Sequence, residues 1–225
     1  MQSVVTAHAQ AMWNLGITMD LAPVLDTAVP SNTIADEADR SFSYDPQIAA
    51  TYGIAYANGL RAGGVVAVGK HFPGFGQANA NTDLSPATDP PLSELQSRDL
   101  IPFQQAIGSG LPVIMITHAS VPGLTGTAPA SLSPATYQYL RNTLHFNGVA
   151  LTDSLSAVAI TDYYTEPAAS VKAIESGADM VMIQATAWQG TLTALQDAVN
   201  VGGLSVAEIN ASVTRILNAK SIATC

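Results

Sequence analysis

Five short runs rich in apolar residues constrain the fold of this chain more than any other feature of its sequence. They cover residues 17–21, 65–68, 113–116, 148–151 and 180–183. Alternation of apolar and polar residues is typical of a strand with one exposed face. A run without alternation predicts a strand that is covered on both faces, as in a parallel sheet.

Longer stretches with apolar residues at helical spacing lie between these runs. They cover residues 4–15, 46–62, 92–107, 134–144, 168–176, 191–199 and 205–223. The last stretch opens with Ser205 and Glu208, the pattern of a capping box in which each side chain bonds the other residue's backbone N–H. Strands and helices alternate without a break in composition, which predicts one α/β domain over residues 1–225.

Polar residues follow the apolar runs at their carboxyl ends. Asp26 comes after the first run, Lys70 and His71 after the second, His118 after the third, and Asp153 after the fourth. In parallel α/β folds, ligands bind at this edge of the sheet. No glycine-rich dinucleotide turn follows the first run and no phosphate loop occurs, so we expect a (β/α) barrel of the TIM type rather than a doubly wound sheet. The two long irregular segments, 26–45 and 74–91, are predicted to be binding loops.

Composition excludes several classes of function. The 225 residues include 8 Lys and Arg against 17 Asp and Glu, a net charge of −9, so the chain lacks the cations that nucleic acid requires. No apolar run is long enough to span a membrane. The single cysteine, Cys225, rules out an internal disulfide, and the four histidines lack metal-site spacing, so we expect neither metal nor cofactor. Low charge and scarce lysine favour a secreted or cell-envelope protein over a cytoplasmic one.

Two constellations carry functional groups, each with a plainer alternative. Lys70 and His71 precede a sharp turn at Pro73 and Gly74, which predicts two donors held toward a polar ligand. The alternative is a salt bridge and a structural histidine. Asp153 ends an apolar run and is suited to the role of nucleophile, base or metal ligand, or to that of a helix N-cap.

Three further residues have the same ambiguity. Asp26 follows the apolar residues Ala22-Pro23-Val24-Leu25, and this position favours a structural role over a catalytic one. Arg40 is suited to bind a ligand hydroxyl or to pair with a neighbouring aspartate, and a histidine placed like His118 more often makes a structural hydrogen bond.

Together these segments are more specific than any one of them. K-H-F-P-G-F-G at residues 70–76 and V-A-L-T-D-S-L-S at 149–156 resemble glycoside hydrolase family 3, which contains β-N-acetylhexosaminidases and β-glucosidases. Matches in the same order include L-A-P-V-L-D at 21–26, R-S-F at 40–42, T-H-A at 117–119 and G-A-D at 177–179, so the likeness covers nearly the whole chain.

The resemblance implies a TIM-like barrel and retaining hydrolysis through a covalent glycosyl-enzyme. It makes Asp153 the nucleophile and gives Arg40, Lys70 and His71 the task of holding sugar hydroxyls. Asp26 and His118 are further candidates for contact with the sugar.

The chain departs from the family pattern at the acid/base. Single-domain hexosaminidases of the family carry D-S-H after the K-H-F-P-G-x-G motif, whereas here Asn81, Thr82 and Asp83 take that place. Asp83 is therefore the candidate acid/base, with a loop-capping role as the alternative. The two-domain β-glucosidases take their acid from a C-terminal domain, which this chain lacks, so we favour the hexosaminidase branch.

The second departure is at the start. The family's barrel begins well before residue 1 of this chain, and its D-x-E-G-G-R segment is absent. Five runs are visible where eight strands close a barrel. Either further strands lie where no apolar run marks them, or the barrel is incomplete at its N-terminus. Open sheet edges would favour pairing with another copy, so we expect self-association or low stability.

We therefore expect a retaining exo-β-glycosidase that removes terminal β-N-acetylglucosamine from glycans such as peptidoglycan or chitin fragments. The alternatives are a family 3 hydrolase of the β-glucosidase type, and a sugar-binding barrel fragment with little or no turnover.

Overall fold

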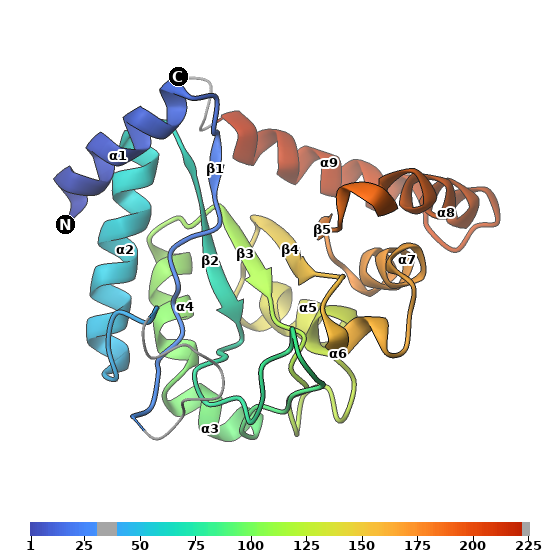
Figure 1. Cartoon of the computed structure of the whole chain (residues 1–225), viewed down its shortest axis with the longest axis horizontal. Helices are drawn as coiled ribbons and strands as arrows, with labels where there is room; N and C mark the ends of the chain where they lie inside the picture. Colours follow the sequence, from blue (N-terminus) through green and yellow to red (C-terminus); the bar gives the residue numbers. More distant parts are fainter. Residues whose placement is uncertain (31–39, 222–225) are drawn as a thin grey trace.

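The computed structural model describes residues 1–30 and 40–221, and five parallel strands form its centre (Figure 1). The strands are β1 (Met19–Asp20), β2 (Val66–Phe72), β3 (Val113–Ile116), β4 (Val149–Ser154) and β5 (Met180–Met182). They are ordered β1-β2-β3-β4-β5, and every neighbouring pair is parallel. Each predicted run contributes one strand, and the sheet curls as half of a barrel. The structure confirms the predicted α/β fold. It also confirms that the barrel formed by the described residues is incomplete.

Side chains alternate between the two faces of the sheet, although both faces are apolar. On β2, Val66 and Val68 point to the inner face, where they pack with Met115 and Leu151 of the next strands. Ala67 and its counterparts on other strands point outward into a larger core beneath the helices. Burial on both faces explains why the first residues of β2 and β4, and all of β3, are apolar without alternation.

Most of the helices lie on the outer side of the sheet, and the last one crosses the end from which the strands start (Figure 1). The helices are α1 (Gln2–Asn14), α2 (Pro46–Ala62), α3 (Leu92–Ser97), α4 (Leu100–Gly108), α5 (Pro134–Gln138), α6 (Val158–Thr161), α7 (Glu166–Ser176), α8 (Trp188–Asn200) and α9 (Val206–Lys220). Short 3-10 turns cover Ala130–Leu132 and Ala185–Ala187. None of the helices in the described part of the chain is long and apolar enough to cross a membrane.

Two predicted helices are interrupted or shortened in the structure. The helix expected over 92–107 is divided into α3 and α4 at Arg98 and Asp99. The break allows the Asp99 side chain to point into the interior, where Arg98 and Gln77 donate hydrogen bonds to it. The helix expected over 134–144 ends at Gln138 and continues as a π-helical turn, Tyr139–Thr143. Residues 74–91 form turns and irregular chain without a helix or strand. Of the other irregular segment, residues 26–45, the part 31–39 lies outside the described residues.

The last helix closes the amino-terminal end of the sheet's inner face. Ser205 and Glu208 form the predicted capping box at the start of α9. Ile216 and Ala219 of α9 pack on the inner-face cluster, and Arg215 donates to the buried carboxylate of Asp179, which begins the turn into β5. Figure 1 shows α9 crossing the end of the sheet from which the strands start, so the opposite, carboxyl end stays accessible.

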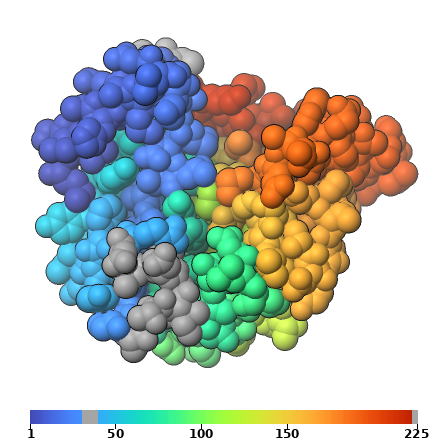
Figure 2. Space-filling view, in the orientation of Figure 1, coloured from blue at the N-terminus to red at the C-terminus, as the bar shows by residue number. Residues whose placement is uncertain are grey.

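Both edge strands are short. Within residues 1–30 and 40–221, neither β1 nor β5 has a strand on its outer side. Figure 2 shows the inner side of the sheet as a hollow between the blue N-terminal part and the orange C-terminal part of the surface.

Candidate active site

The lysine and histidine of the second motif lie on a strand. β2 continues past the predicted run to Phe72, so Lys70 and His71 form its carboxyl end instead of following it. The segment before residue 26 runs parallel beside them, since the Lys70 N–H donates to the Pro23 carbonyl (3.1 Å) and the Leu25 N–H to the Lys70 carbonyl (2.6 Å). The peptide bond Lys70–His71 is cis, as is Phe72–Pro73.

The turn after β2 requires both of its glycines. Gly74 has φ +137°, and a Cβ there would lie 2.5 Å from the Cβ of Asp99. A Cβ at Gly76 would lie 2.2 Å from the backbone oxygen of Thr27. This explains the glycines of the K-H-F-P-G-x-G motif, because the turn packs directly against the chain that follows Asp26.

A polar cavity of about 340 Å³ opens at the carboxyl ends of β2 and β4. Five of the seven predicted site residues line it: Arg40, Lys70, His71, Asp83 and Asp153. Phe75, Asn81 and Thr82 complete the lining. The structure thus brings together two carboxylates and two cations from four separate segments.

Asp153 is the carboxylate at the end of β4. Its Oδ1 accepts a hydrogen bond from the N–H of Ser154 (2.8 Å), and its Oδ2 lies 3.9 Å from Nε2 of His71. A quarter of its side chain is exposed to the cavity. A fixed, accessible carboxylate of this kind is suited to attack an electrophilic carbon.

Asp26 does not line the cavity. Its side chain is fully buried behind His71, and Oδ2 accepts from the His71 Nδ1–H at 2.7 Å. The backbone N–H groups of His71 (3.0 Å) and Phe75 (2.8 Å) donate to Oδ1. Burial would raise the pKa of Asp26, but the charge of His71 and these hydrogen bonds outweigh it and hold the pKa below its usual value.

His118 also lies outside this cavity, in a separate hollow beside Ser120 and Tyr163. Its Nε2–H donates to the carbonyl oxygen of Ser154 (2.8 Å), so Nδ1 accepts from the hydroxyl of Ser131 (2.7 Å). Burial lowers the pKa of His118, which keeps the ring neutral, despite the opposing charge of Asp153. Both ring nitrogens are therefore engaged in holding the end of β4.

Asp83 lies on a loop, residues 81–83, that lines the same cavity as Asp153. The turn is closed by Asn81, whose Oδ1 accepts from the Asp83 N–H (2.9 Å), and Ala159 donates to the Thr82 carbonyl (3.0 Å). The Asp83 side chain is exposed and makes no hydrogen bond with the residues that the structure describes. Its carboxyl group is accessible to a ligand in the cavity.

Two further carboxyl groups, which were not among the predicted site residues, lie behind the site. Burial raises the pKa of Asp99 to about 6, although the charge of Arg98 opposes this. Asp89 is buried without a hydrogen-bond partner for either oxygen among the described residues, and burial together with the charges of Asp26 and Asp99 raises its pKa well above the usual value. Neither residue ends an apolar run, so no sequence pattern marks them.

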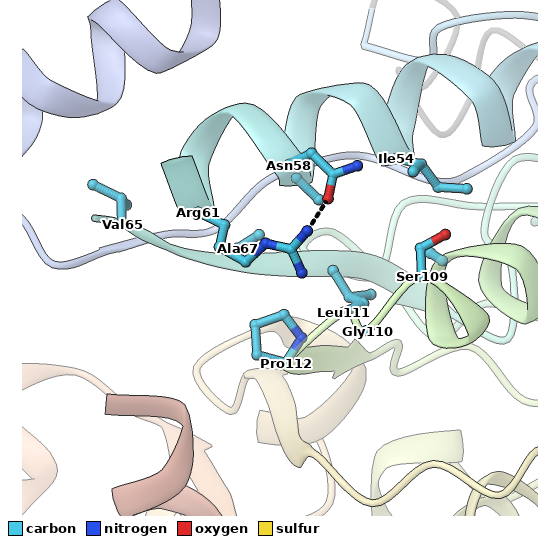
Figure 3. Close-up of a pocket in the computed structure, with 11 residues that line it drawn as sticks. Ile54, Asn58, Arg61, Val65, Ala67, Ser109, Gly110, Leu111 and Pro112 are labelled. Carbon is cyan, nitrogen blue, oxygen red and sulfur yellow. Dashed lines mark hydrogen bonds between the residues drawn. The ribbon is translucent and has the colours of Figure 1, made fainter. Parts of the chain in front are cut away.

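No other feature of the described chain competes as a catalytic site. A crevice between α2 and the start of β3, about 20 Å³, is lined mainly by apolar side chains and by the hydrogen-bonded pair Arg61 and Asn58 (2.7 Å, Figure 3). It holds about one water molecule, and its lining contains no carboxylate, histidine or cysteine. Over residues 1–30 and 40–221, no three His, Cys, Asp or Glu side chains are grouped closely enough to hold a metal ion.

Comparisons of the sequence and of the fold with known proteins give one consistent result. Residues 1–219 match the family described as "Glycosyl hydrolase family 3 N terminal domain". A β-hexosaminidase of Mycobacterium tuberculosis, LpqI, is 37% identical over 221 residues, which cover 95% of this chain and 56% of that protein. The chain therefore spans little more than half of that relative's length.

Solved structures give the same picture. A glycosyl hydrolase of family GH3 from Mycobacterium smegmatis superposes with a TM-score of 0.91 at 37% identity, over 98% of this chain and 68% of that one. A family 3 β-N-acetylglucosaminidase from a Paenibacillus species superposes with a TM-score of 0.94 at 30% identity, over 99% of this chain and 43% of that one.

Proposed function

Because the chain belongs to glycosyl hydrolase family 3, we propose that it is a retaining exo-β-glycosidase that removes terminal β-N-acetylglucosamine from glycans. One observation carries the proposal: Arg40, Lys70, His71, Asp83 and Asp153 come from separate segments and line one polar cavity. The choice of sugar rests on the similarity to the LpqI β-hexosaminidase and to the Paenibacillus β-N-acetylglucosaminidase.

In the proposed reaction, an oxygen of Asp153 attacks the anomeric carbon of the terminal sugar. The bond from that carbon to the leaving oxygen breaks, and Asp83 gives its proton to the departing oxygen. A water molecule then attacks the anomeric carbon of the glycosyl ester. Asp83 takes a proton from the water, Asp153 is released as a carboxylate, and the sugar leaves with its β configuration retained.

The cations fix the substrate in this scheme. Arg40 and Lys70 line the same cavity as both carboxylates and donate hydrogen bonds to sugar hydroxyls. Holding the ring in one orientation over Asp153 lowers the entropic part of the barrier. His118 acts indirectly, because its bond to the Ser154 carbonyl fixes the end of the strand that carries Asp153. Peptidoglycan or chitin fragments, in a secreted or cell-envelope setting, are the substrates we propose.

Hydrolysis of aryl β-N-acetylglucosaminide and aryl β-glucoside by the wild type and by Asp153→Asn tests the proposal. An activated aryl group needs little help from an acid, so the result does not depend on Asp83. We expect turnover of the N-acetyl substrate and its loss in Asp153→Asn. The matched control is Asp162→Asn, at an exposed aspartate that follows α6 and does not line the cavity, and it should keep full activity.

Other outcomes point to the alternatives. Faster turnover of the glucoside would replace the hexosaminidase assignment with a β-glucosidase. Absence of turnover with both substrates, together with N-acetylglucosamine binding measured by calorimetry, would replace hydrolysis with sugar binding alone. The half-barrel sheet, with neither edge strand paired on its outer side within the described chain, is the observation that favours this second function.

A further inference from the structure

We propose that Asp26 is a positioning residue that holds His71 as an imidazolium, with its Nε2–H directed at Asp153 and at the sugar bound in front of it. The proposal rests on the proposed glycosidase function. It changes the role expected of Asp26 from direct contact with the sugar to control of the histidine beside the nucleophile.

The hydrogen bonds of Asp26 determine where the protons of His71 lie. The Asp26 carboxylate accepts, so the hydrogen at 2.7 Å belongs to Nδ1 of His71. The backbone N–H of His71 also donates to the same carboxylate. Ring and backbone are thus bound to one fixed group, which leaves Nε2 as the only ring nitrogen that faces the cavity.

The surroundings of the ring allow little movement. The His71 side chain is 7% exposed, and its ring packs edge-on against Phe75, with the centroids 5.8 Å apart. Phe75 is in turn tied to Asp26 through its backbone N–H (2.8 Å). One buried carboxylate therefore fixes both the ring and the aromatic wall beside it.

The charges around His71 favour the protonated ring. Asp26 faces it from behind at 2.7 Å and Asp153 from β4 at 3.9 Å, both on the imidazole nitrogens. Other ionisable groups lie near the ring. Arg40, Lys70 and Asp83 line the same cavity. Outside the cavity, His118 follows β3, and Asp89 and Asp99 lie behind Asp26. A carboxylate beside each ring nitrogen favours the positive charge of a protonated ring.

An imidazolium at this place serves both steps of the proposed reaction. Its Nε2–H is a donor for a sugar hydroxyl next to the anomeric carbon. Its charge also lies beside the oxygen of Asp153, so it stabilises the carboxylate that leaves when the glycosyl ester is hydrolysed.

The direct test is an NMR titration of the histidine rings in the whole chain, with the His71 signal identified by its absence in His71→Gln. In the wild type we expect both nitrogens of His71 to carry protons at pH 7. In Asp26→Asn the ring should lose its proton at a pH lower by at least about one unit, since the opposite charge at 2.7 Å is removed. The matched control is Asp99→Asn, a buried aspartate behind the same turn that does not bond His71, and the His71 titration should stay within a few tenths of a unit.

The activity assay provides the second readout. Asp26→Asn should lower kcat/KM about a hundredfold and move the alkaline limb of its pH profile toward acid, because the ring loses its proton earlier. If Asp26 had a purely structural role, Asp26→Asn would lower kcat/KM at every pH without shifting the alkaline limb of the pH profile.

Different results would refute the role of Asp26 and the proposed glycosidase function. A wild-type His71 that is neutral at pH 7, with a bare Nε2, would overturn the role of Asp26 even if Asp26→Asn does not fold. A wild type without glycosidase activity but with a protonated His71 that depends on Asp26 would refute the proposed function and leave the coupling between Asp26 and His71 in place.

Discussion

Replacement of Asp179 by alanine should destabilise the fold more than any surface change, because this carboxylate joins three parts of the chain. Its Oδ2 accepts from Arg141 (2.6 Å) and from the backbone N–H of Ala150 on β4 (2.8 Å). Its Oδ1 accepts from Arg215 (2.8 Å) and Ser212 (2.8 Å) on α9. The side chain is fully buried, so water does not replace these bonds in the folded wild type.

The structure allows the loss to be estimated. Removal of one partner from a buried ion pair costs about 3–5 kcal/mol, and here an Ala150 N–H on a buried strand also loses its acceptor. The guanidinium groups of Arg141 and Arg215 are 21% and 30% exposed, so water regains part of their hydration and the cost stays within that range. In a chain of this size about 1 kcal/mol lowers Tm by about 2–4 °C, so Asp179→Ala should melt about 6–20 °C lower.

Urea unfolding followed by circular dichroism measures the difference. The control is Asp197→Asn on the exposed side of α8, which should stay within about 0.5 kcal/mol of the wild type. A loss below about 1 kcal/mol in Asp179→Ala would refute the reasoning, since it would mean that the arginines and α9 hold their places without this carboxylate.

Three further predictions concern the site and its support. Asp83→Ala should slow substrates with poor leaving groups at least about a hundredfold more than activated aryl glycosides; equal slowing of both, in steady-state assays, would remove Asp83 as the acid. Gly76→Ala should destabilise the chain by about 1–3 kcal/mol in urea unfolding, because its Cβ would meet the backbone of Thr27, whereas Gly108→Ala, with open space around it, should not destabilise it. The pKa of Asp99 is about 6 in the folded chain against an ordinary value of 3.8, so folding favours its protonated form, and stability should fall as pH rises from about 4 to about 6. Asp99→Asn should flatten that decline, on the order of 2 kcal/mol, in urea titrations across this range.

Self-association through the open sheet edges stays a prediction. β1 and β5 expose unpaired backbone groups on their outer sides within the described residues, and such edges favour pairing with another copy. Light scattering during size-exclusion chromatography checks it, and a monomer at high concentration would contradict it.

The strands were predictable because burial on both faces leaves a strong local signal. Each apolar run became a strand, and the capping box of Ser205 and Glu208 formed as expected. Element ends were less predictable. Lys70 and His71 belong to β2 although they are polar, because Pro23 and Leu25 provide hydrogen bonds to that part of the strand from a distant segment.

The sequence also predicted that five candidate residues would lie together, since their motifs are specific in combination, and these residues line one cavity. Their roles stay predictions. The roles of the others depend on contacts between distant residues. Asp26 is buried behind His71, His118 is engaged by two serines, and Asp89 and Asp99 lie behind the site because of how the turn after β2 packs. Local sequence cannot encode such contacts, because each depends on where another segment of the chain lies.

The order of the strands has a consequence for how the chain folds. Every strand pairs only with the strands before and after it in sequence, so the longest-range contacts of the sheet join neighbouring βα units. A chain built in this way can add one strand at a time to a growing edge as it emerges from the ribosome, without threading a late segment between two early ones. The same property makes the architecture tolerant of gain or loss of whole βα units at either edge, because each such change alters one interface and leaves the others intact.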